Sequence, residues 1–71
     1  MKEPIKLLDV VALIDDIPDK SLFGGQVGTV VELLAPGVFE VEFSDSRTGH
    51  AYAMLALRSE QLLPLRYAPV G

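Results

Sequence analysis

The amino-acid sequence predicts an all-β domain of five short strands that close into a small barrel. Its apolar runs are short and are separated by Gly, Pro, Asp and Ser, a spacing typical of all-β domains. Residues 38–43 alternate apolar and acidic side chains with the period of two that a half-buried strand requires. A chain of 71 residues has room for one domain with one core. We therefore expect a single domain over residues 1–71, with its core within 7–65 and loose termini.

The first strand is predicted at Asp9–Ile14. It leads into the turn-rich segment Asp15–Lys20, where the Ile17-Pro18 step disfavours a helix. A long loop with two glycines ends before Gly28, and the second strand is predicted at Thr29–Leu34.

The third strand is the clearest signal in the sequence. Residues 35–37, Ala-Pro-Gly, predict the turn before it, because Pro fixes its own φ and Gly accepts a positive one. The strand itself is predicted at Val38–Phe43. Its apolar side chains Phe39, Val41 and Phe43 should face the core, and its two glutamates should face water.

A polar hairpin loop at 44–49 predicts the start of the fourth strand, His50–Leu55. Residues 57–61 suit a single 3₁₀ turn. The last strand begins at Leu62 and Leu63, and Pro64 restricts it to an edge or a start. This order of strands, long first loop and late helical turn is the layout of an SH3-like barrel.

The Ala-Pro-Gly turn also predicts a pairing register. A three-residue loop sets Leu34 opposite Val38, Leu33 opposite Phe39, Glu32 opposite Glu40 and Val31 opposite Val41. Leu33 and Val31 would then join the core. A β-bulge near Val30-Val31 is the alternative, because a barrel strand must bend and both valines are then free to point inward.

Composition narrows the function classes. The formal net charge is −4, and the six Lys and Arg residues are scattered along the chain, which argues against binding to a phosphate backbone. The absence of cysteine leaves neither disulfides nor thiolate metal sites and fits a reducing cytoplasm. No apolar stretch approaches the ~20 residues that span a bilayer. We expect no metal and no cofactor.

Catalytic chemistry is not indicated. His50 is the single histidine, and its place at a loop–strand junction fits a surface residue better than a general base. Asp15, Asp16 and Asp19 lack the spacing of a calcium loop. The sequence therefore predicts a binding module rather than an enzyme.

Two surfaces are candidates for protein partners. Glu32, Glu40 and Glu42 should project from adjacent strands, with Asp15 and Asp16 nearby, and a surface of one sign steers a basic partner. The alternative is that these charges only keep an apolar-rich chain in solution. Tyr52 and Met54 would also be exposed if the intervening residues of their strand face inward, and both residue types are common in interfaces. That exposure would favour a homo-oligomer. The opposite facing is the alternative, in which Tyr52 fills the end of the barrel.

Residues 25–31, Gly-Gln-Val-Gly-Thr-Val-Val, resemble the Gly-x-x-Gly-x-Val turn of KOW-type SH3-like barrels, found in ribosomal and transcription-elongation proteins. This resemblance implies nucleic-acid or ribosome binding. The residues themselves favour a structural turn at 25–31, in which glycine permits two backbones to approach closely. The basic and aromatic side chains that usually accompany such a site are absent here.

A longer resemblance spans about residues 5 to 65. The chain is similar to a bacterial family known as domain of unknown function 4926, on residues 7–13, 16–18, 25–32, 36–43 and 52–53. The resemblance implies a compact bacterial protein without an established activity. It also implies, for some members, a companion of a neighbouring gene product in the manner of an antitoxin or immunity protein. It supplies no site residues.

Overall fold

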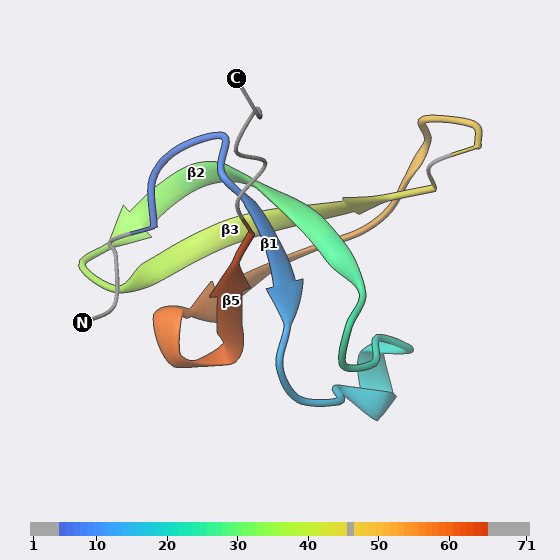
Figure 1. Ribbon diagram of the computed structural model, residues 1–71, viewed down its shortest axis with the longest axis horizontal. Helices are drawn as coiled ribbons and strands as arrows, with labels where there is room; N and C mark the ends of the chain where they lie inside the picture. Colours follow the sequence, from blue (N-terminus) through green and yellow to red (C-terminus); the bar gives the residue numbers. More distant parts are fainter. Residues whose placement is uncertain (1–4, 46, 66–71) are drawn as a thin grey trace, which may run out of the picture.

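The computed structural model describes residues 5–45 and 47–65, which form one antiparallel sheet of five strands in the order β4-β3-β2-β1-β5 (Figure 1). These residues contain no α-helix. The strands are β1 (Val10–Leu13), β2 (Val27–Ala35), β3 (Val38–Ser44), β4 (Ala51–Arg58) and β5 (Leu62–Pro64), with 3₁₀ turns η1 (Pro18–Lys20) and η2 (Ser59–Gln61). The all-β prediction is confirmed. The predicted loose ends fall on residues 1–4 and 66–71, outside the described part.

The predicted closure of the barrel is not found. β4 and β5 form the two edges of the sheet, and no strand pairing joins them in residues 5–45 and 47–65. The turn η2 connects these edges, and its Gln61 side chain accepts the backbone N–H of Arg58 through Oε1 at 2.8 Å. Because the Arg58 N–H already donates to Gln61, it is not available for a hydrogen bond between β4 and β5.

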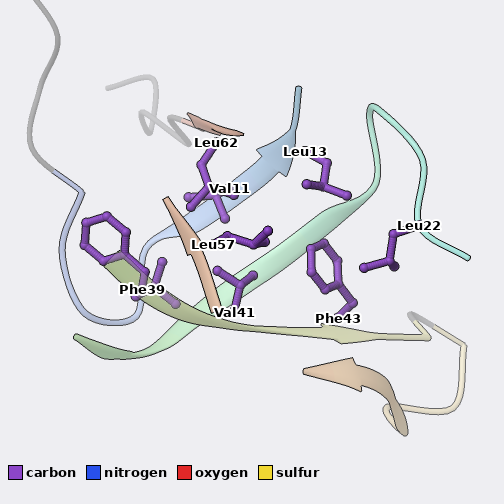
Figure 2. Close-up of a cluster of buried hydrophobic side chains, with 9 residues drawn as sticks. Val11, Leu13, Leu22, Phe39, Val41, Phe43, Leu57 and Leu62 are labelled. Atoms are coloured by element: carbon purple, nitrogen blue, oxygen red, sulfur yellow. The ribbon is translucent and has the colours of Figure 1, made fainter. Parts of the chain in front are cut away.

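The core lies on one face of the curled sheet (Figure 2). The inward residues of β3 are buried as predicted, and they meet side chains from every other strand. Phe43, Val41 and Val30 have no exposed surface. The buried cluster comprises Val11, Leu13, Leu22, Val30, Phe39, Val41, Phe43, Leu57 and Leu62.

One core residue comes from the long first loop. Leu22 is completely buried although it lies outside the strands of the sheet. A bridge with Ile17 holds it: the Ile17 N–H donates to the Leu22 carbonyl at 2.7 Å, and the Leu22 N–H donates back at 3.2 Å. The loop therefore folds on itself and inserts its own apolar side chain into the core.

The pairing of β2 with β3 agrees with half of the predicted register. Leu33 faces Phe39 and Glu32 faces Glu40, as predicted, but Val41 faces Val30 instead of Val31. The bulge of the alternative is therefore confirmed, but only Val30 of the two valines joins the core. At the turn, Val38 faces Ala35 rather than Leu34, because a second irregularity shortens the loop to Pro36-Gly37.

Leu33 and Val31 do not belong to the core. Val31 is half-buried, since the bulge at this position gives its inward place to Val30. Leu33 is 53% exposed. It shares the face of Phe39, but it lies beyond the part of β2, Val27 to Thr29, with which β1 pairs.

β4 is longer than predicted. It continues to Arg58, because it pairs with β3 along its whole length. Leu57, assigned to the turn in the prediction, is instead a buried strand residue opposite Phe39. The 3₁₀ turn itself is confirmed at Ser59–Gln61. Pro64 lies in an edge strand, as predicted.

Candidate partner-binding surface

The outer face of the sheet carries the predicted glutamates. Glu40 and Glu42 are half-buried on β3, and Glu32 is exposed on β2. Pairing sets Glu40 between Glu32 and Ala56, while Glu42 lies between Thr29 and Met54. Residues directly opposite one another share a face of the sheet. The three glutamates, here called the acidic row, are therefore brought together as the sequence predicts.

Met54 belongs beside the acidic row. Its side chain is 51% exposed, and it lies directly opposite Glu42. The Ser59 N–H donates to the Gly37 carbonyl at 3.0 Å, which fixes which β3–β4 pairs carry hydrogen bonds. By alternation, Glu42 and Met54 form a non-hydrogen-bonded pair, whose Cα atoms are only about 4.5 Å apart. A carboxylate and an exposed thioether therefore share one small area.

An aliphatic area adjoins the acidic row on the same face. Ala12 lies between Val27 and Leu63 through its pairing on both sides. Val27 is 43% exposed and Leu63 54% exposed, while Ala12 is buried beneath them. Val10 faces Thr29, which in turn faces Glu42. The outer face thus passes from aliphatic to acidic across neighbouring strands.

Asp15 and Asp16 do not lie beside this row. Pairing aligns Glu42 with Val10 through Thr29, whereas Asp15 and Asp16 follow the far end of β1 in the loop drawn below it in Figure 1. Asp16 has a structural role there, because its Oδ1 accepts the Gly24 N–H at 2.8 Å. Asp15 is exposed.

Tyr52 is exposed but belongs to the end of the core. A register shift separates Phe43 from Ser44 in the pairing with β4 and leaves Tyr52 as the extra residue. Its ring lies against that of Phe43, with centroids 6.5 Å apart. Its hydroxyl accepts a hydrogen bond from Gln26 Nε2 at 3.0 Å. Tyr52 therefore connects the β3–β4 hairpin to the first loop rather than extending the acidic row.

The glycine motif is a structural turn. A Cβ at Gly28 would come within 2.7 Å of Val41 Cγ1 and 2.9 Å of the Glu42 carbonyl, so only glycine fits where β2 crosses β3. Gly25 instead has φ +94° and open space around it, and its requirement is conformational. Gly28 is thus required for close packing and Gly25 for its backbone conformation, and both roles are structural.

The described residues contain no group of three or more His, Cys, Asp or Glu placed to hold a metal ion. Within the same ranges, no polar or charged side chain is buried.

The pKa of Asp45 is lowered. The larger cause is the Arg47 N–H, which donates to the Asp45 carboxylate, and the smaller is the Arg47 side chain. No helix in the described part of the chain is both long and apolar enough to cross a membrane.

The fold and the outer face define a small, single-sheet all-β domain with an acidic row bordered by apolar side chains. The profile of the family described as "Domain of unknown function (DUF4926)" matches residues 7–64, and the chain belongs to that family. The resemblance stated from the sequence is thereby confirmed. The comparisons found no match among curated proteins and none among solved structures.

Proposed function

We propose that this protein is a non-catalytic module that binds a basic protein partner through the outer face of its sheet. The observation that carries the proposal is the acidic row, Glu32, Glu40 and Glu42, placed on adjacent strands by the β2–β3 register. The strand order also supports an SH3-like architecture with the barrel left open between β4 and β5.

Charge supports a basic partner. Glu32 and Glu40 lie directly opposite one another, and like charges in that position destabilise a sheet. A cationic side chain placed between the two carboxylates relieves their repulsion. Complementary charge also accelerates the encounter of two proteins.

Exposed apolar side chains support a protein partner rather than a simple counterion. Met54 borders Glu42, and the aliphatic area of Ala12, Val27 and Leu63 continues the same face. Interfaces combine an apolar centre with a polar rim. A basic amphipathic segment would match both parts of this face.

A paired set of charge reversals tests the proposal. Glu40→Lys with Glu42→Lys inverts the acidic row, and both side chains point away from the core. Asp15→Lys with Asp19→Lys makes the same change in net charge in the exposed first loop. Tagged wild-type and variant proteins are used to capture partners from a lysate of the source cells, at several salt concentrations.

We expect the β3 variant to lose the partner and the loop variant to retain it, with wild-type binding weakened by salt. Both variants should keep the circular dichroism spectrum of the wild type. If the β3 variant captures the same proteins as the wild type, the outer face is not the binding surface.

The partner we propose is the product of a neighbouring gene in the cytoplasm, with this protein as its antitoxin-like or regulatory companion. Co-expression of the two reading frames followed by co-purification tests this pairing. Loss of co-purification on reversal of Glu40 and Glu42 would assign the contact to the acidic row. Co-purification that is insensitive to the reversal would assign it elsewhere.

A further inference from the structure

The hydrogen bonds at the ends of β4 identify the backbone groups that face away from β3. Ser59 donates to the Gly37 carbonyl at 3.0 Å, and the His50 carbonyl accepts the Asp45 N–H at 2.9 Å. In an antiparallel pair, alternate residues point toward the partner strand. Counting back from Ser59, Leu57, Leu55 and Ala53 face β3, whereas Arg58, Ala56 and Met54 face the open edge. Counting forward from His50 gives the same result once Tyr52, the extra residue at the register shift, is left out of the alternation.

The open edge of β4 is capped at one end and bare in the middle. The Arg58 N–H donates to Gln61 Oε1 at 2.8 Å, so η2 satisfies it. No other strand pairs with this edge in the described residues. Met54 and Ala56 therefore present both N–H and C=O groups there. β4 also carries no Lys or Pro, the residues that commonly protect an edge strand.

The opposite edge of the sheet is protected. Leu65 donates to the Val10 carbonyl and Ile14 donates to the Gln61 carbonyl, both at 2.9 Å. The same alternation directs Leu62 and Pro64 away from β1. Pro64 has no N–H to offer, and β5 has three residues. The molecule therefore has one edge suited to strand addition and one that is not.

We propose that a second copy of this chain pairs with β4, edge to edge and antiparallel, about a two-fold axis at Leu55. This register sets Met54 of one copy opposite Ala56 of the other, and it uses every free donor and acceptor of both residues. Four intermolecular hydrogen bonds result. Because the β5 edge is blocked, the pairing closes as a dimer and does not extend into a fibre.

Side chains and charges suit the second copy as the occupant. At the seam the large Met54 meets the small Ala56, and Ala53 meets Leu57, so no like charges face one another. The acidic residues of β3 lie one strand behind the seam. Those of the two copies are about 14 Å apart, three strand spacings, which exceeds the Debye length of about 8 Å at physiological salt. The inference does not depend on the proposed basic partner.

Sedimentation velocity from 10 μM to 1 mM tests the state of the wild-type chain, which we expect to form a reversible dimer. Ala56→Pro removes the outward N–H without removing a bond to β3, so we expect a folded monomer. Leu33→Lys is the control, because Leu33 is exposed on β2, which is not an edge strand. This variant should dimerise like the wild type.

Disulfide trapping tests the register. The chain has no cysteine, so single variants report one position each. A hydrogen-bonded pair has Cα atoms about 5.5 Å apart, within the range a disulfide accepts. Oxidising Met54→Cys mixed with Ala56→Cys should give more covalent dimer than either alone or than Ala51→Cys. A monomeric wild type at 1 mM, a dimeric Ala56→Pro, or no gain on mixing would each overturn the proposal.

Discussion

Glu32 on β2 lies directly opposite Glu40 on β3, at the centre of the outer face. Like charges directly opposite in an antiparallel pair lower the stability of the sheet by a few tenths of a kcal/mol. On the β4 side the residue directly opposite Glu40 is Ala56, and no cation lies directly opposite either carboxylate. Arg58 lies diagonally from Glu40, opposite Val38, and its Nε is 4.0 Å from Glu60 Oε1.

Replacing Glu32 should therefore stabilise the domain. We expect Glu32→Lys to raise the free energy of unfolding by about 0.5 kcal/mol, and Glu32→Gln by less, because Lys adds an attraction to Glu40. Urea unfolding at low and high salt measures both changes. The gain should shrink at high salt, and a gain that is independent of salt would show that charge is not its cause.

Gly28→Ala should be strongly destabilising. The added methyl would meet Val41 and the Glu42 carbonyl closer than 3.0 Å, and overpacking of this kind costs about 1–3 kcal/mol. Gly37→Ala is the matched control: its Cβ would meet only Ser59 Oγ at 3.8 Å, but φ is +73°. That control should cost about 1 kcal/mol from backbone strain. Equal losses of unfolding free energy would argue against the close contact at Gly28.

Asp45 should titrate below the usual aspartate range of about 3.9. Its pKa is lowered chiefly by the Arg47 N–H, which Arg47→Ala retains, and secondarily by the Arg47 side chain, which that variant removes. We therefore expect Arg47→Ala to raise the pKa only partly, as followed by NMR of the Asp45 carboxyl carbon.

The lowered pKa also sets the sign of the pH dependence. A carboxyl group whose pKa is lower in the folded than in the unfolded state stabilises the fold at pH values above its unfolded-state pKa. This contribution is lost as the pH falls through its folded-state pKa. Asp45→Asn should remove that contribution. The free energy of unfolding of this variant should therefore decrease less steeply with falling pH than that of the wild type. An unchanged acid profile would contradict this role.

Alternation along β3 made both faces of that strand predictable from the sequence. A period of two places Phe39, Val41 and Phe43 inside, and their glutamate neighbours are then necessarily outside. The bulge at Val31 was only one of two options, because two consecutive valines fit either facing. Glu40 and Glu42 of the acidic row were predictable for the same reason as the core, whereas the place of Glu32 depended on the register of the turn.

Other features depend on tertiary contacts that a local pattern does not contain. Leu22 is buried because its loop bridges back to Ile17, and nothing in the residues around it has a strand period. The hydrogen bond from Gln26 to Tyr52 joins residues 26 apart. The sheet is open between β4 and β5, and a composition typical of a 3₁₀ turn does not specify whether the two strands that flank the turn pair with one another.

The contact between Gln26 and Tyr52 should be measurable as a coupling. Tyr52→Phe keeps the ring against Phe43 but removes the hydroxyl that accepts from Gln26. We expect a loss of about 0.5–1 kcal/mol in unfolding free energy. A double-mutant cycle with Gln26→Ala should give a coupling of similar size. Additive effects would mean that the hydrogen bond does not contribute to stability.

Leu8 adopts a left-handed conformation with φ +71° and is 69% exposed. The turn that holds it is closed by the Asp9 N–H, which donates to the Lys6 carbonyl at 3.0 Å. A leucine in this conformation costs about 1–2 kcal/mol, and asparagine tolerates it better. We expect Leu8→Asn to raise the free energy of unfolding by about 0.5–1 kcal/mol in a denaturant titration.

Leu7→Asn provides the comparison for Leu8→Asn, since Leu7 is a neighbouring leucine, 52% exposed, and is not in a left-handed conformation. It loses the same apolar side chain without relieving backbone strain, so its stability should stay equal to that of the wild type or fall slightly. The difference between the two variants isolates the backbone term. If Leu8→Asn is no more stable than Leu7→Asn, the left-handed leucine is not under strain.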